Sequence, residues 1–156
     1  VAGTEMGIVD PVSTFSACFG EAFLPLHPYQ YAEMLAEKCE KHNAKVWLIN
    51  TGWVRGSFGI GKRMNLTQTR AIIDSIHDDS LDMSKTNTMR RFQLQVPETV
   101  FGVDPEILRP INCWPDRDAY KTTCKKLATQ FAENFKRYED GVPAEVIKKG
   151  GPNLSF

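Results

Sequence analysis

A glycine-rich segment with basic side chains is the part of this sequence whose residue types could bind a nucleotide. Residues 56–62 fit the G-x-x-x-x-G-K pattern of phosphate-binding loops, whose backbone amides cradle phosphate groups. Arg63, however, occupies the place of the Ser or Thr that would bind Mg²⁺, and residues 64–66 separate the loop from the next predicted helix. We therefore interpret the match to the phosphate-loop pattern as accidental.

The basic side chains of this segment allow another kind of ligand contact. Arg55, Lys62 and Arg63 lie in the segment, and Thr69 and Arg70 follow in the next predicted helix. A planar guanidinium can stack on an aromatic base and hydrogen-bond to its edge, and a hydroxyl can contact the base directly. A solvated loop with scattered charges has the same residue types, so both interpretations stay open at this point.

Hydrophobic patterning predicts a strand before this loop and a helix after it. Residues 45–50 form a continuous apolar run, which is typical of a strand covered on both faces. Isoleucines on one helical face predict a helix over about residues 67–77, with Asn65 or Thr67 as its N-cap.

Similar patterns predict three more elements. A helix should begin at Pro28, a residue favoured at the first helical position, and end at Asn43. Alternating apolar and polar residues at 92–96 predict a strand. Asp104 followed by Pro105 predicts the start of a short helix.

The longest predicted helix follows the N-cap Asp116 and continues to about residue 138. Apolar side chains recur along it at helical spacing, and we expect this stripe to pack into a core. The stripe consists of Tyr120, Cys124, Leu127, Ala128, Phe131, Phe135 and Tyr138.

Composition argues against several kinds of partner and site. Basic and acidic side chains balance at 19 each, so charge gives no reason to expect nucleic acid or an anionic membrane as a partner. No apolar run approaches the ~20 residues of a membrane helix.

The four cysteines lack C-x-x-C spacing, and we expect reduced thiols in a cytoplasmic protein. We interpret His27, His42 and His77, which are widely spaced, as surface or packing residues rather than metal ligands.

The two ends of the chain suggest a longer parent. The chain begins at Val1 without a Met, and we expect this start to be a cut through a longer polypeptide. The other end contains Gly150, Gly151 and Pro152, and residues 139–156 are expected to be a loose tail.

Short segments in a particular order carry a family resemblance. They are residues 14–20 (TFSACFG), 22–28 (AFLPLHP), 50–53 (NTGW), 61–63 (GKR), 69–74 (TRAIID) and 102–105 (GVDP). Together they resemble the carboxy-terminal region of ATP-type phosphoenolpyruvate carboxykinases, from the first residues to about Tyr138. Motifs in a shared order are far more specific than any one of them alone.

The resemblance implies a fold and a domain organisation. The chain would have a mixed α/β fold and form the carboxy-terminal part of a carboxykinase nucleotide-binding domain. We expect residues 1–156 to be a single incomplete domain. Within it, residues 1–11 would be a mobile lid, residues 12–138 part of the nucleotide-binding domain, and residues 139–156 the loose tail.

The resemblance also implies a reaction and its cofactors. In this family oxaloacetate and ATP give phosphoenolpyruvate, CO₂ and ADP, which is a step of gluconeogenesis. Mg²⁺ accompanies the nucleotide, and Mn²⁺ typically accompanies the substrate. No catalytic residue or metal ligand of the family can be matched in this chain, so the chain alone is expected to be inactive.

Three residues match nucleotide-binding positions of the family. Arg63 and Met64 correspond to positions that embrace the adenine, and Thr69 to a further nucleotide contact. Met64 stands where we expect isoleucine, a change that matters little if backbone and apolar bulk make the contact. Val54 and Arg55 stand where we expect small residues, so the loop departs from the family pattern at these two positions.

Two other hypotheses belong to different functional classes. One is a self-contained nucleotide-binding module that uses residues 56–62 as a phosphate cradle. The other is a non-catalytic interaction domain whose helix at 116–138 docks on a partner.

Overall fold

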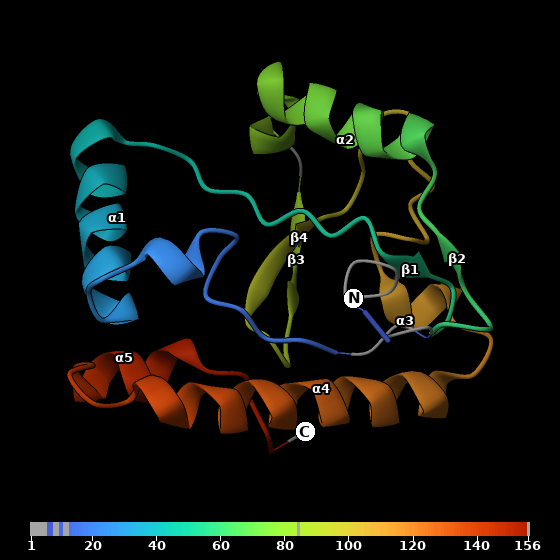
Figure 1. The fold of residues 1–156 in the computed structure, drawn as a ribbon. Coiled ribbons are helices and arrows are strands. Elements are labelled where there is room, and N and C mark those ends of the chain that lie inside the picture. The colour runs from blue at the N-terminus through green and yellow to red at the C-terminus, as the bar shows by residue number, and fades with distance from the viewer. Residues whose placement is uncertain (1–5, 8–9, 11–12, 84, 156) are drawn as a thin grey trace. The chain divides into compact units, whose positions relative to one another are not determined.

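The computed structural model describes residues 6–7, 10, 13–83 and 85–155, which combine helices with two small antiparallel sheets (Figure 1). The predicted mixed α/β class is therefore confirmed.

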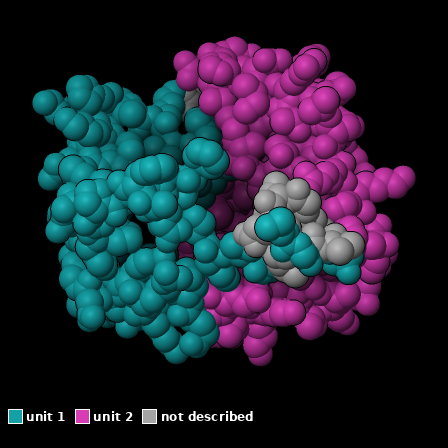
Figure 2. Space-filling view, viewed as in Figure 1, with its two compact units in different colours: residues 1–48, 133–150 teal, residues 49–132, 151–156 magenta. Residues whose placement is uncertain are grey.

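The chain forms two compact units, one of residues 1–48 and 133–150 and the other of residues 49–132 and 151–156 (Figure 2). Most of the expected lid, namely residues 1–5, 8–9 and 11, lies outside the described residues. The lid and the single incomplete domain stay predictions.

The first unit contains the helix predicted from Pro28. Helix α1 spans Pro28–His42, and His27 Nδ1 accepts a hydrogen bond from the Tyr29 amide at 3.2 Å. Asn43 ends the helix in the left-handed conformation that asparagine tolerates, with φ of 49°. Both predicted ends are confirmed. The unit also contains the 3-10 helices η1 (Glu21–Phe23) and η3 (Lys136–Tyr138) and the helix α5 (Ala144–Gly150).

The apolar run at residues 45–50 does not form the predicted strand. The side chains of Val46 and Leu48 are 63% and 79% exposed, and no strand of the described chain pairs with the run. A strand needs a neighbour for its backbone hydrogen bonds, and an apolar pattern does not itself supply one. The prediction was therefore wrong.

In the second unit, helix α2 (Leu66–His77) begins after its predicted N-cap. Asn65 Oδ1 accepts a hydrogen bond from the Gln68 amide at 2.8 Å. One side of α2 packs on a buried cluster, and Gly102 lies so near that a Cβ atom there would be 3.4 Å from Cβ of Ala71. This core cluster consists of Leu81, Val100, Val103 and Ile107.

Strands β3 (Thr86–Met89) and β4 (Leu94–Pro97) form an antiparallel hairpin. The predicted strand at 92–96 begins only at Leu94, because the two residues before it belong to the turn. There the Gln93 amide donates to the Met89 carbonyl at 2.7 Å, and φ of Gln93 is 56°.

The end of the chain, expected to be loose, is hydrogen-bonded to this turn. Arg91 Nη1 donates to the Asn153 carbonyl at 3.1 Å, and the Asn153 amide donates to the Arg91 carbonyl at 2.7 Å. Gln93 Nε2 donates to the Gly151 carbonyl at 3.0 Å. These bonds hold residues 151–153 against the β3–β4 turn.

The short helix predicted at Asp104 is wrong in position. Residues 105–108 form turns, and helix α3 (Pro110–Cys113) begins later. A residue before proline is disfavoured in the helical conformation, and Arg109 accordingly has φ of −123° and ψ of 81°. The proline thus separates the turns from the helix.

The longest helix, α4 (Arg117–Phe135), begins after Asp116 as predicted. Asp116 Oδ1 accepts hydrogen bonds from the amides of Asp118 and Ala119 at 2.8 and 3.1 Å. The apolar stripe is covered only in part, because Ala128 is fully buried while Phe131 is 45% exposed.

A second hairpin precedes α2. Strand β1 (Trp53–Val54) pairs antiparallel with β2 (Lys62–Arg63), so that Trp53 lies opposite Arg63. Where the two strands leave the loop, their backbones approach closely: a Cβ atom at Gly61 would lie 2.3 Å from the Gly56 carbonyl oxygen. Only glycine fits there.

We expect Gly61→Ala to destabilise the hairpin by about 1–3 kcal/mol, because the added methyl group meets backbone atoms that must move. Thermal unfolding and amide hydrogen exchange of the loop would measure the effect. Gly151→Ala is the matched control, since nothing lies within 4 Å of its added Cβ atom. Equal stability of the two variants would contradict the close approach.

Tyr120, in the first turn of α4, should ionise at unusually high pH. Burial of the phenol, with a smaller contribution from Cys124, raises the pKa of Tyr120 from 10.0 to about 12. The folded state thus holds the phenol proton more tightly than the unfolded state, and this contribution to stability is lost as pH rises from about 10 toward 12. Ultraviolet titration of the protein and of Tyr120→Phe would isolate this tyrosine by difference. A difference curve with its midpoint near pH 10 would contradict the assignment.

Candidate functional site

Arg63 and Met64, two of the predicted nucleotide contacts, point to opposite sides of the β1–β2 hairpin. Side chains alternate along an extended chain. Arg63 is exposed, whereas Met64 is half-buried and packs against the core cluster. The Met64 amide also donates to the Gly52 carbonyl at 3.0 Å, which continues the strand pairing. The backbone next to Arg63 is therefore held by the packing of Met64 on the core cluster and by its hydrogen bond to Gly52.

The guanidinium of Arg63 lies over the ring of Trp53, its cross-strand neighbour. Arg63 Cζ is 5.6 Å from the centre of the indole ring, which is within the range of a cation–π contact. Phe58 meets the same indole edge-on, with ring centres 5.3 Å apart. Trp53 therefore orients Arg63.

Trp53 was not predicted to have this role, although the residue belongs to the NTGW motif. Prediction of an antiparallel hairpin at this position would have identified it, because cross-strand neighbours interact directly.

Thr69 lies in the first turn of α2 and is half-buried. Its hydroxyl donates to the Asn65 carbonyl at 3.0 Å, as does its amide, also at 3.0 Å. The hydroxyl oxygen can still accept a hydrogen bond. All three predicted residues lie in the second unit, and their joint contact with one nucleotide stays a prediction.

The geometry of residues 56–62 differs from that of a phosphate cradle. The loop connects two antiparallel strands, whereas a phosphate loop runs from a strand directly into a helix. The amides of Ile60 and Gly61 both donate to the Ser57 carbonyl, at 3.1 and 2.8 Å. Two amides of the loop are thus satisfied internally, which agrees with an accidental match.

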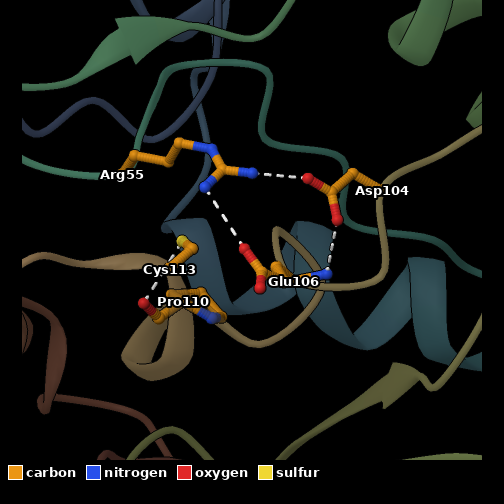
Figure 3. Close-up of polar contacts among 5 residues, drawn as sticks. All are labelled: Arg55, Asp104, Glu106, Pro110 and Cys113. Carbon is orange, nitrogen blue, oxygen red and sulfur yellow. Dashed lines mark hydrogen bonds and ion pairs between the residues drawn. The ribbon is translucent and has the colours of Figure 1, made fainter.

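Arg55 is engaged by carboxylates rather than available to a ligand. Figure 3 shows its guanidinium between Asp104 and Glu106, with nitrogen–oxygen distances of 2.5 and 3.2 Å. Two negative charges face one positive charge, so this group has no net attraction for an anion. The interpretation of Arg55 as part of a ligand-binding cationic loop is not supported. The pairing spans about 50 residues of sequence and gave no local signal.

The described residues show no metal centre. Nowhere among them do three or more His, Cys, Asp or Glu side chains gather with the spacing of metal ligands. His27 caps α1, and His42 and His77 lie in the last turns of α1 and α2. All four cysteines are described, and all are free thiols. None of the described helices combines the length and apolarity of a membrane span.

Comparison with known proteins links the chain to one family. The model of the phosphoenolpyruvate carboxykinase family, in its ATP-dependent form, matches residues 1–106. Proteins named phosphoenolpyruvate carboxykinase (ATP) from Campylobacter lari and Sulfurimonas denitrificans are each 53% identical over 154 residues. The protein of that name from Dictyostelium discoideum is 51% identical over 150 residues.

These alignments cover 96–99% of the chain but only 27–29% of the relatives. The chain therefore spans less than a third of the length of the curated proteins it matches. The family model matches more than half of the chain, and these relatives are 51–53% identical to it, so its family membership is established. This chain belongs to the ATP-dependent phosphoenolpyruvate carboxykinase family.

Proposed function

We propose that this chain contributes the adenine-binding part of the nucleotide-binding domain in a longer, cytoplasmic phosphoenolpyruvate carboxykinase. That enzyme would convert oxaloacetate and ATP to phosphoenolpyruvate, CO₂ and ADP in gluconeogenesis. The observation that carries the nucleotide assignment is the exposed guanidinium of Arg63, held over Trp53 beside the anchored Met64. The names of the relatives, which specify ATP, support the choice of nucleotide. The free cysteines agree with a reducing compartment.

The proposed contact suits an adenine because the base is flat, aromatic and uncharged. The Arg63 guanidinium lies over the indole of Trp53 and the residue is exposed, and a planar guanidinium can stack on a base and hydrogen-bond to its edge. A side chain already oriented in the free protein loses less conformational freedom on binding. Met64 would supply apolar bulk and backbone contacts, and the Thr69 hydroxyl a polar contact.

The triphosphate and the metal ions would be held elsewhere. Phosphoryl transfer needs cations that neutralise the charge developing on the phosphate oxygens, a role that Mg²⁺ and Mn²⁺ would fill. No set of metal ligands gathers among the described residues. Because the chain spans less than a third of its relatives' length, we assign the metal ligands and the catalytic residues to the remainder of the longer polypeptide, and we expect this chain alone to be inactive.

In the longer protein, we expect Arg63→Ala to raise the ATP dissociation constant about tenfold, through the loss of ~1–2 kcal/mol of stacking and hydrogen bonding. Arg63→Lys keeps the charge but loses the planar group, so most of the affinity should still be lost. Isothermal titration calorimetry would measure both constants.

Arg117→Ala is the matched control, because it removes an exposed arginine at the start of α4, outside the candidate site. Unchanged ATP affinity in Arg63→Ala would refute the adenine assignment. Loss of nucleotide binding in Lys62→Ala alone would instead favour the phosphate-cradle hypothesis.

We also expect the remainder of the longer protein to cover apolar surface that is exposed here. Val46, Trp47 and Leu48, consecutive residues of the extended run, are 63%, 37% and 79% exposed. Contiguous exposed apolar surface usually marks an interface. The chain expressed alone should therefore bind a hydrophobic fluorescent dye, and the full-length protein should bind much less per mole. An isolated chain that stays monomeric, melts cooperatively and binds no dye would contradict this expectation.

A further inference from the structure

The backbone of Arg55 adopts a conformation that an arginine rarely takes. Its φ of 65° lies in the left-handed region, where a Cβ atom is crowded and glycine is usual. Arg55 also directly precedes the close contact of Gly56 with Ile60 and Gly61. An arginine at such a position needs an interaction that compensates for the conformation, and its guanidinium makes two ion pairs.

The carboxylates that pair with Arg55 lie on a turn whose flanking residues are buried in the core cluster. Asp104 Oδ1 accepts a hydrogen bond from the Glu106 amide at 3.0 Å, which leaves Oδ2 directed at Arg55 (Figure 3). Val103 and Ile107, on either side of the turn, are 7% and 8% exposed and belong to the core cluster. The ion pairs therefore connect the loop to the packed core.

The β1–β2 hairpin is thus attached to the same core at two points. Met64, which follows β2, packs directly on the core cluster. Arg55, which follows β1, reaches the turn that contributes Val103 and Ile107. Trp53 and Arg63 lie opposite each other on the two strands, so the orientation of both depends on these attachments.

We propose that Arg55 is a positioning residue for adenine binding, which acts by fixing the hairpin on which Arg63 lies over Trp53. The inference rests on the proposed function of Arg63. Arg55 does not contact the nucleotide, because its charge is already balanced by Asp104 and Glu106. Exposed ion pairs are individually weak, but here two carboxylates hold one planar guanidinium, which restricts its geometry.

The first test measures ATP affinity of the full-length protein by calorimetry. Arg55→Ala should raise the dissociation constant about three- to tenfold, and Arg55→Lys, which cannot hold both carboxylates in one plane, by less. Asp104→Asn keeps an oxygen for the Glu106 amide while removing the charge, so it should resemble Arg55→Ala. Arg109→Ala is the matched control, since Arg109 is 48% exposed against 49% for Arg55 and pairs with Glu98.

Coupling to Arg63 distinguishes positioning from direct contact. If Arg55 acts through Arg63, Arg55→Ala should change ATP affinity less than about twofold in an Arg63→Ala background. Additive effects of the two substitutions would overturn the positioning role. An Arg55→Ala protein that binds ATP normally would also overturn the positioning role. If Arg63→Ala still weakens ATP binding in that case, the proposed function of Arg63 stands.

A second readout needs no nucleotide. In protein labelled with fluorotryptophan, the fluorine resonance of Trp53, assigned with Trp53→Phe, should shift or broaden in Arg55→Ala and Asp104→Asn but not in Arg109→Ala. An unchanged Trp53 resonance in the first two variants would overturn the inference. If Arg63→Ala leaves ATP affinity unchanged while this resonance responds, the proposed function fails and the attachment of the hairpin by Arg55 stands. Should Arg55→Ala not fold, Asp104→Asn and Arg55→Lys give the same comparisons.

Discussion

The contact of Met64 with the core cluster is the interaction on which the candidate site depends. Side chains alternate along an extended strand, so the burial of Met64 forces its neighbour Arg63 outward. The same cluster receives α2, which carries Thr69, and the turn that carries Asp104. One small group of apolar side chains therefore fixes the backbone of every residue assigned to the nucleotide.

Around this core, arginines with similar sequence surroundings have different roles. Arg63 is presented to solvent on an aromatic ring, whereas Arg55 is directed back to carboxylates of the same chain. Both belong to a glycine-rich loop, and residue type alone cannot separate them. The group that each guanidinium contacts determines its role. For Arg55 these groups are the carboxylates of Asp104 and Glu106, which lie 49 and 51 residues away in sequence. A basic loop is thus weak evidence for an anion site until its internal ion pairs are known.

Features that depend on a few neighbouring residues were predictable from the sequence. The start of α1 at Pro28 and of α2 after Asn65, and the cap at Asp116, all rest on hydrogen bonds within one helical turn. The short helix predicted at Asp104 was wrong in position, and the reason is local too, since Pro110 disfavours a helical Arg109 and α3 begins only at Pro110. Features that need distant partners were not predictable. The apolar run at 45–50 forms no strand, because no strand of the described chain lies beside it to pair with its backbone.

The candidate site divides in the same way. Arg63, Met64 and Thr69 were identified through a family resemblance rather than from physical chemistry alone, because their residue types also fit a solvated loop. The β1–β2 pairing that places Trp53 beneath Arg63 was missed, because short strands around a glycine-rich loop carry little hydrophobic pattern. The two carboxylates that hold Arg55 gave no signal at all in its neighbourhood.

The half-exposed ion pairs of Arg55 also make the hairpin responsive to ionic strength. Mobile ions screen a pair whose members are 49% and 35% exposed, whereas the apolar attachment through Met64 is insensitive to such screening. One attachment of the hairpin therefore loosens in concentrated electrolyte and the other does not. The affinity for the uncharged adenine would therefore depend on salt concentration, although the base carries no charge that salt could screen.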